Sequence, residues 1–263
     1  MVITILIVLG LCFGSFVGAF VWRLKNNKDW VNDRSVCEHC KHVLAPQDLV
    51  PLLSWLALQG KCRYCHRQIS WQNPVVELAT AVLFVTSYLY WPLGFEAEGI
   101  TLFIFWLIFL VGFMALILFD IKWMILPNSI VFPLAGLAVL GVLARAITFH
   151  GGLSVLYEAF WGVLIGGGLF YALFQASNGK WIGGGDVKLG AVLGLIVGGP
   201  AAALLLIFMA SVMGSLVAVP LMMTKRLKPT SRLPFGPFLI AAAIVVYLHG
   251  ASLLSWYQNQ LLV

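Results

Sequence analysis

Long apolar runs alternate with short polar segments along almost the whole chain. The runs cover approximately residues 2–21, 74–91, 100–119, 129–147, 155–176, 187–199, 201–223 and 235–256. A helix needs about 20 mostly apolar residues to cross a lipid bilayer, and most of these runs approach that length. The pattern therefore predicts an all-α polytopic membrane protein with about eight transmembrane helices, of which the 187–199 segment is the shortest.

Composition supports the lipid bilayer as the main partner of this chain. The sequence is 61% hydrophobic and 10% charged, whereas soluble domains average about 25% charged residues. The net charge of +6 could suggest nucleic-acid binding, but the basic residues do not interleave with aromatic residues on a soluble face. We expect a membrane protein that binds no nucleic acid.

The basic residues predict how the chain is oriented. The first apolar run lacks the preceding positive charge and the small-residue cleavage site of a signal peptide, so we expect it to be retained. If the amino terminus lies outside, the inner side collects every Lys and Arg except Arg145. Cytoplasmic loops are the loops enriched in Lys and Arg. This distribution places the carboxyl terminus outside as well.

One extended polar segment, residues 23–73, separates a first helix (1–22) from the remaining transmembrane part (74–263). It contains two C-x-x-C pairs, whose members are Cys37, Cys40, Cys62 and Cys65. Two such pairs suit one tetrahedral metal ion, although the spacing between them slightly exceeds the usual range. Disulfides are the alternative, but thiols stay reduced in a cytoplasmic loop. We predict one structural zinc ion bound by four sulfur atoms, with the loop histidines exposed to solvent.

Two aspartates stand at the ends of apolar runs. Asp120 ends the 100–119 run, and Asp186 follows Gly183-Gly184-Gly185. Two spans lie between them, so both fall at the same membrane face. Ionisable residues at membrane depth are candidates for function, and a close carboxylate pair retains one proton and can activate water. The simpler alternative is that Asp186 caps the following helix.

Other residues near these segments have structural and functional interpretations. The three glycines before Asp186 would permit unusual dihedral angles and close approach of a substrate. Glu77 falls in the first turn of its helix, where an anion is favoured by the helix dipole. Lys188 could influence Asp186, but a lysine that extends to the membrane interface is the simpler interpretation.

These motifs together resemble the type IV prepilin peptidases, the GxGD class of intramembrane aspartyl proteases. The resemblance extends over nearly the whole chain. It rests on Gly14-Ser15-Phe16 with Arg23-Leu24, the two cysteine pairs, Gly60-Lys61-Cys62-Arg63, Ile69-Ser70, Pro74-Val75-Val76-Glu77-Leu78, Phe119-Asp120 with Leu126-Pro127, Gly183 to Leu189, and Pro234-Phe235-Gly236-Pro237-Phe238. Gly18, Lys25 and Asn128 depart from common family residues, and Asn128 supports Asp120 as the catalytic acid.

The resemblance implies a bifunctional enzyme of the bacterial inner membrane with a periplasmic amino terminus. Such enzymes cleave the leader peptide of prepilins and type II secretion pseudopilins at the cytoplasmic face, and they methylate the new amino terminus with S-adenosylmethionine. Asp120 and Asp186 match the catalytic pair. Gly60, Lys61 and Glu77 are the candidates for methyl transfer.

Two other functions remain open at this point. A leader peptidase without methyltransferase activity would share the catalytic pair. A proton-coupled membrane carrier could use the same carboxylates, although transporter sites tend to lie near the membrane midplane.

Overall fold

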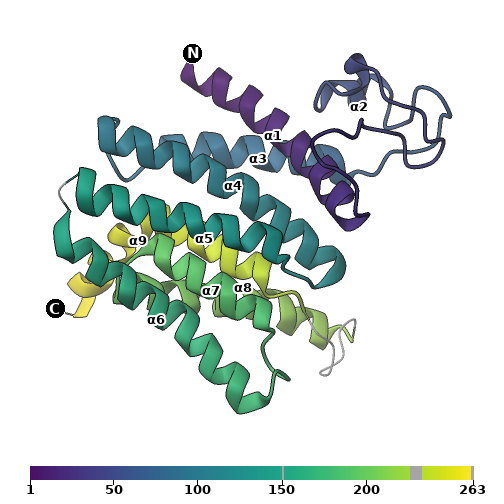
Figure 1. Cartoon of the computed structure of the whole chain (residues 1–263). Helices are drawn as coiled ribbons and strands as arrows, with labels where there is room; N and C mark the ends of the chain where they lie inside the picture. Colours follow the sequence, from purple (N-terminus) through teal and green to yellow (C-terminus); the bar gives the residue numbers. More distant parts are fainter. Residues whose placement is uncertain (150, 226–232, 262–263) are drawn as a thin grey trace. The chain divides into compact units, whose positions relative to one another are not determined.

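The computed structural model describes residues 1–149, 151–225 and 233–261, and eight long helices carry most of this part of the chain (Figure 1). They are α1 (Val2–Lys25), α3 (Gln72–Leu89), α4 (Ala97–Trp123), α5 (Asn128–Leu143), α6 (Gly152–Ser177), α7 (Gly184–Val197), α8 (Pro200–Met223) and α9 (Gly236–Leu261). Shorter elements are η1 (Pro46–Asp48), α2 (Leu53–Ala57) and the π-helical η2 (Ala144–Thr148). Each predicted apolar run therefore forms a helix.

Six helical segments among the described residues are long and apolar enough to cross a membrane. They are α1, α4, α5 continued by η2, α6, α8 and α9. Helix α7 has 14 residues and rises about 21 Å, short of the roughly 30 Å hydrocarbon core. Helix α3 carries Gln72, Asn73 and Glu77 in its first two turns. The all-helical multi-span fold is confirmed, and eight predicted spans compare with six helices that meet these criteria.

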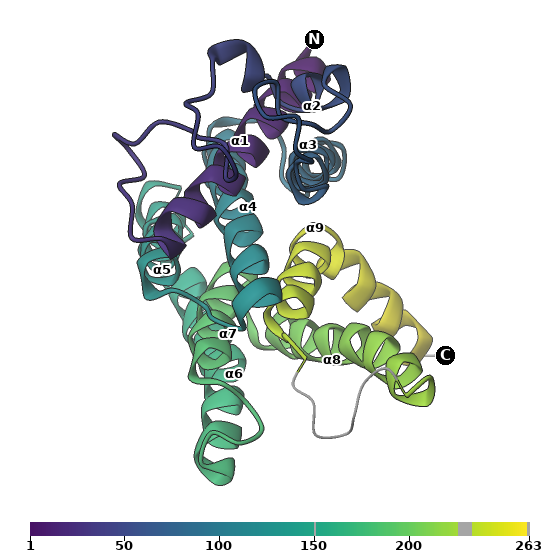
Figure 2. The same cartoon turned by 90° about the vertical axis from the view of Figure 1, so that its right-hand side faces the viewer.

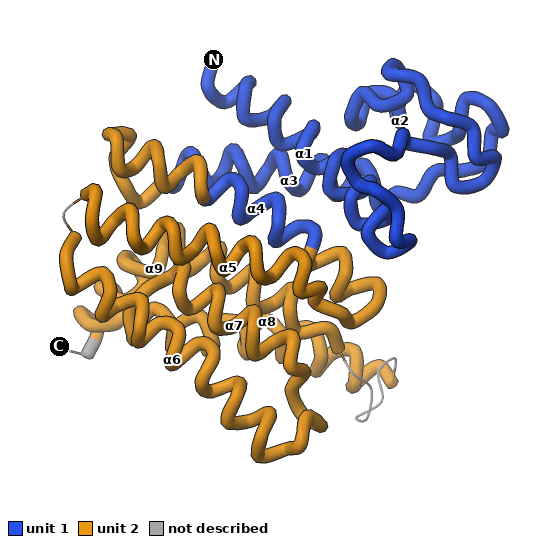
Figure 3. The backbone as a smooth tube through the Cα atoms, in the orientation of Figure 1, with its two compact units in different colours: residues 1–90, 106–115 blue, residues 91–105, 116–263 orange. Residues whose placement is uncertain are grey.

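The chain divides into two compact units, which Figure 3 shows in different colours. Unit 1 comprises residues 1–90 and 106–115, and unit 2 comprises residues 91–105 and 116–263. Arg226, Lys228 and Arg232, three of the basic residues predicted on the inner side, lie outside the described residues.

Unit 1 is built on the close packing of α1 against α3. A Cβ atom added to Gly10 would lie 2.4 Å from the Cα atom of Ala81, and one added to Gly14 would lie 2.5 Å from that of Glu77. Only glycine allows the two backbones to approach so closely, as small residues do at other membrane helix interfaces. The polar segment of residues 26–71 connects these two helices.

Unit 2 is organised around the short helix α7. It packs against α5, α6, α8 and α9, and its Leu189 and Leu193 are fully buried. A Cβ atom on Gly162 of α6 would lie 2.2 Å from the carbonyl oxygen of Gly194, so α6 and α7 are in backbone contact. Helices α8 and α9 run side by side, as Figure 2 shows. The amino terminus of α7, which follows Gly183, carries one of the two candidate carboxylates.

Candidate active site and metal centre

Asp120 lies in the last turn of α4 and is 6% exposed. The helix ends three residues later, because Met124 adopts the left-handed conformation and donates its N–H to the carbonyl oxygen of Asp120. The Oδ2 atom of Asp120 accepts a buried hydrogen bond of 2.9 Å from the backbone N–H of Gly236. Gly236 is the first residue of α9, so this carboxylate binds one of the backbone donors that a helix amino terminus leaves without a partner.

Asp186 lies in the first turn of α7, so its carboxylate, like that of Asp120, is at the amino terminus of a helix. Its Oδ2 atom accepts the N–H of Gly183 at 3.3 Å, and its own N–H donates to the carbonyl oxygen of Gly183 at 3.1 Å. The capping interaction considered from the sequence is therefore present. The capping bond uses the Oδ2 atom of the half-buried Asp186 side chain and does not use its Oδ1 atom.

Leu126 connects the surroundings of the two carboxylates. Its Cδ1 atom would lie 3.2 Å from a Cβ atom on Gly185, which precedes Asp186, and its Cδ2 atom 3.5 Å from a Cβ atom on Gly236. The same Cβ atom on Gly236 would lie 2.7 Å from Oδ2 of Asp120. The loop after α4 and the first residues of α7 and α9 therefore meet at Leu126, and Asp120 and Asp186 share this neighbourhood within unit 2.

The charge of Asp120 affects the pKa of Asp186. Asp186 lies outside the six helices that meet the criteria for spanning. Burial and, as the second cause, the negative charge of Asp120 raise the pKa of Asp186 to about 6, against the opposing effect of the Gly183 hydrogen bond. A like charge close to a carboxyl group disfavours its ionised form. The two groups therefore influence each other's protonation.

The glycines before Asp186 serve packing rather than unusual dihedral angles. Gly183 is in ordinary extended conformation, with φ −76° and ψ 148°, and Gly184 and Gly185 begin α7. The unusual dihedral angles that these glycines would permit are not adopted here, and the close approach of a substrate stays a prediction. Leu126 packs against Gly185. Lys188 donates to Oδ1 of Asn128 at 3.0 Å instead of pairing with Asp186.

The four cysteines of the polar segment come together in unit 1. The Sγ atoms of Cys37, Cys40, Cys62 and Cys65 all lie within 4.8 Å of one another, and those of Cys37 and Cys65 are 3.9 Å apart. Two matching turns build the cluster. Cys37 donates its N–H to the carbonyl oxygen of His42, and Cys62 donates to that of Arg67 in the same way, each at 2.9 Å. The four thiols could hold one metal ion.

The thiol of Cys37 is prepared for ionisation. Burial raises its pKa, but the backbone N–H groups of Cys40 and His39 and the neighbouring thiols of Cys62 and Cys40 outweigh this effect and lower the pKa to about 7. The thiolate is the form of cysteine that binds metals. His42, one of the histidines predicted to be exposed, packs its ring against Tyr64 with a centroid separation of 3.7 Å.

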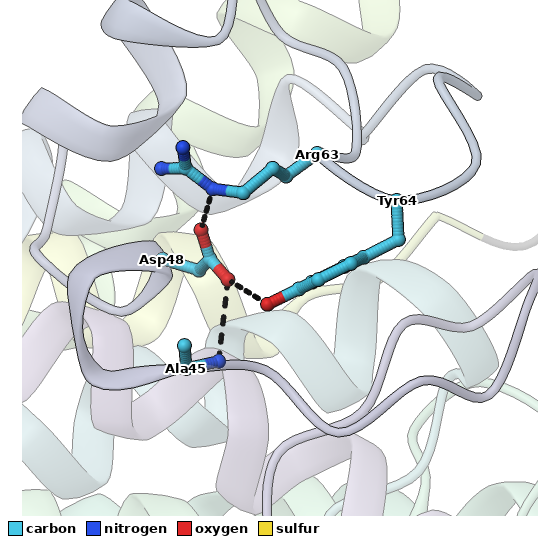
Figure 4. A network of polar contacts seen from close by, with 4 residues as sticks. All are labelled: Ala45, Asp48, Arg63 and Tyr64. Carbon is cyan, nitrogen blue, oxygen red and sulfur yellow. Dashed lines mark hydrogen bonds and ion pairs between the residues drawn. The ribbon is translucent and has the colours of Figure 1, made fainter.

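Asp48 braces the second cysteine turn (Figure 4). It accepts hydrogen bonds from Arg63 Nε at 2.7 Å, from Tyr64 Oη at 3.0 Å and from the N–H of Ala45 at 3.2 Å. Burial would raise the pKa of Asp48, but these bonds hold it below its usual value. Arg63 and Tyr64 are the two residues between Cys62 and Cys65, so η1 is tied to that turn.

The three candidates for methyl transfer also lie in unit 1. Gly60, with φ +70°, and the exposed Lys61 immediately precede the second cysteine turn. Glu77 is 6% exposed, and its Oε2 atom accepts the N–H of Leu52 at 2.7 Å. Sequence reasoning did not assign roles to Gly236, Leu126 or Leu52. The Pro234–Phe238 motif pointed to Gly236, and the Leu126-Pro127 motif pointed to Leu126. No sequence motif pointed to Leu52 or to its positive φ.

Comparisons with known proteins cover nearly the whole chain. Residues 8–91 match the Bacterial Peptidase A24 N-terminal domain, and residues 107–219 match the Type IV leader peptidase family. The chain is 32% identical to the prepilin leader peptidase/N-methyltransferase of Bacillus subtilis (strain 168), over 97% of each chain. It is also 32% identical to the protein of that name from Stutzerimonas stutzeri, over 95% of this chain and 92% of the relative. No solved structure matches.

The shared neighbourhood of the two carboxylates predicts a measurable coupling. Asp120→Asn should lower the pKa of Asp186 from about 6, because it removes the nearby negative charge while retaining an acceptor for the Gly236 N–H. Carbon-13 NMR of aspartate-labelled protein across a pH series measures this pKa. Glu158→Gln, beside Gly198 at the opposite end of α7 within the same unit, is the control and should leave it unchanged. An unchanged pKa in Asp120→Asn would show that the two carboxylates do not interact.

Proposed function

Because the chain belongs to the type IV leader peptidase family, we propose that it cleaves the leader peptide of prepilins and pseudopilins and then methylates the new amino terminus. The observation that carries the peptidase assignment is the pair of carboxylates at the amino termini of α7 and α9, joined through Leu126. Hydrolysis of an amide by two carboxylates requires one ionised and one protonated group at a shared water. The coupling of Asp186 to Asp120 supports this division of one proton between them.

The chemistry follows from the two protonation states. The ionised carboxylate removes a proton from water, whose oxygen attacks the peptide carbonyl carbon, and the protonated carboxyl donates to the carbonyl oxygen. Collapse of the tetrahedral intermediate breaks the C–N bond, and the departing nitrogen takes a proton from the pair. The hydrogen bonds from Gly236 and Gly183 hold Oδ2 of the two side chains, and in this proposal Oδ1 of each acts on the water and the substrate. The roles belong to the coupled pair, which titrates as a unit.

We infer that cleavage takes place at the cytoplasmic face of the bacterial inner membrane, with the amino terminus in the periplasm. The concentration of Lys and Arg on one predicted side supports this orientation. With this orientation, we propose three parts of the chain: a first helix (1–22), a cytoplasmic metal-binding loop (23–73) and a peptidase part (74–263).

We infer that the cysteine cluster binds one structural zinc ion. Zn–S bonds of about 2.3 Å in a tetrahedron separate the sulfur atoms by roughly 3.8 Å, close to the 3.9 Å between Cys37 and Cys65. Four protein ligands close the coordination sphere, as in structural zinc sites. The zinc would hold the two cysteine turns together and thereby fix Gly60 and Lys61, which precede Cys62.

We assign methyl transfer to the segment beside the second cysteine turn. S-adenosylmethionine supplies an electrophilic methyl group when bound. Lys61 is exposed, and its ammonium group can pair with the carboxylate of that donor. Gly60 gives the turn a conformation with positive φ that a larger residue adopts only at a cost.

The peptidase assignment predicts the effect of removing either acid. Asp120→Asn and Asp186→Asn should each slow prepilin cleavage in detergent by about 10²–10⁴-fold, the usual contribution of general acid–base catalysis. Asp33→Asn is the control. Thermal unfolding should confirm that the variants fold. Cleavage at the wild-type rate by either folded variant would rule out the carboxylate pair.

The metal assignment predicts about one zinc ion per chain in purified protein. Cys62→Ser should weaken zinc binding by more than the roughly 10–100-fold typical of losing an outer hydrogen-bond partner, and it should reduce methyl transfer from labelled S-adenosylmethionine. Cys12→Ser is the matched control, because Cys12 lies outside the cysteine group. A metal-free purified protein, or full zinc retention in Cys62→Ser, would contradict the assignment. Cleavage without methyl transfer in the wild type would identify a peptidase alone.

A further inference from the structure

A strained turn lies in the polar segment between the two cysteine pairs. Leu52 has φ 59° and ψ −49°, and Leu53 donates its N–H to the carbonyl oxygen of Pro51 across it. This is the classic γ-turn, which is rare because L-residues with side chains adopt it at an energetic cost. Such a turn persists only where surrounding interactions hold it. The short helix α2 begins at the next residue.

Glu77 supplies that interaction from α3. Its Oε2 atom accepts the N–H of Leu52 at 2.7 Å, across 25 residues of sequence. Ser15 of α1 also lies beside this side chain. It is 6% exposed, at the level where Gly14 brings the backbones of α1 and α3 together. One buried carboxylate therefore joins both helices to the strained turn, through a charge-assisted bond of the stronger kind.

A continuous set of contacts leads from this turn to Gly60. Trp55 of α2 accepts the N–H of Gly60 at its carbonyl oxygen, at 2.8 Å. Its indole covers Gly60 so closely that an added Cβ atom would lie 2.8 Å from Cζ2 of the ring. The Trp55 ring also packs on Trp71, with centroids 4.2 Å apart. The position of Leu52 therefore determines that of α2, and α2 determines that of Gly60 and Lys61.

We propose that Glu77 is a positioning residue for methyl transfer: its carboxylate holds the Leu52 turn and so sets the position of Gly60 and Lys61 against α1 and α3. This proposal rests on the proposed methyltransferase function of that segment. The buried carboxylate already binds the Leu52 N–H, so Glu77 acts through the backbone and not by contact with the methyl donor.

Three variants separate positioning from chemistry. Glu77→Ala removes the acceptor, so methyl transfer should fall by about tenfold to a hundredfold, the equivalent of a hydrogen bond to a charged group, with a raised KM for S-adenosylmethionine. Glu77→Gln keeps an oxygen acceptor for the Leu52 N–H and should retain most of the activity. Thr80→Ala is the matched control, because buried Thr80 lies one turn along the same helix and bonds only to Val76.

The experiment uses full-length zinc-loaded protein in detergent with a prepilin substrate. Methyl incorporation, peptide cleavage, zinc content and hydrogen exchange at the Leu52 amide are measured on the same samples. Glu77→Ala should lose Leu52 protection while cleavage and zinc content remain at wild-type levels. If Glu77→Ala fails to fold, Glu77→Met, which fills a similar volume without an oxygen acceptor, provides the same comparison.

Two results would overturn the proposal. Wild-type methyl transfer in folded Glu77→Ala, or in Glu77→Met where that is the variant that folds, would show that the turn needs no anchor. Loss of methyl transfer in Glu77→Gln with intact Leu52 protection would show that the carboxylate takes part in the chemistry itself. Absence of methyl transfer from the wild type would instead refute the proposed methyltransferase function, which keeps the two failures distinct.

Discussion

The structure depends on carboxylates held by backbone N–H groups at the start of helices. Asp120 binds the first N–H of α9, and Asp186 binds the N–H of Gly183 before α7. The amino terminus of a helix favours an anion, because its N–H groups lack partners and its dipole is positive there. Helix termini can thus fix two acids in apolar surroundings without a cationic side chain. A lysine or arginine bound to either acid would neutralise the charge needed for water activation.

Close helix packing brings these termini to one place. Glycines let α6 and α7 make backbone contact, and Leu126 packs on Gly185 and Gly236. Methyl-sized additions at those glycines would displace Leu126 or Asp120 itself, which is why overpacking at such positions is costly. In unit 1 the same type of interaction recurs, since Glu77 binds a backbone N–H of the polar segment. Each unit therefore uses a buried carboxylate to hold a segment for which we propose a function.

Much of this arrangement could be predicted from the sequence. Apolar runs located all eight long helices, because burial in lipid requires continuous apolar surface, and the cysteine spacing predicted a cluster of four thiols that the structure forms. The pairing of Asp120 with Gly236 could not be predicted, because it joins residues 116 positions apart through a backbone N–H. The Pro234–Phe238 motif marks Gly236 but does not indicate its partner. The γ-turn at Leu52 could not be predicted for a related reason, because the bond that stabilises it comes from Glu77, 25 residues away in the sequence. The ordinary dihedral angles of the glycines before Asp186 could not be predicted, since sequence shows that a Cβ atom is missing but not which neighbour fills the space.

We propose that Asp120 and Asp186 form one coupled pair around a shared water. The chain contains five aspartates, so selective carbon-13 labelling of their carboxyl groups gives a spectrum simple enough to assign. Carbon–carbon dipolar recoupling by solid-state NMR, on protein in lipid bilayers, then reports directly which carboxyl carbons are neighbours. We expect a coupling between Asp120 and Asp186. Two resolved resonances without mutual coupling would contradict it.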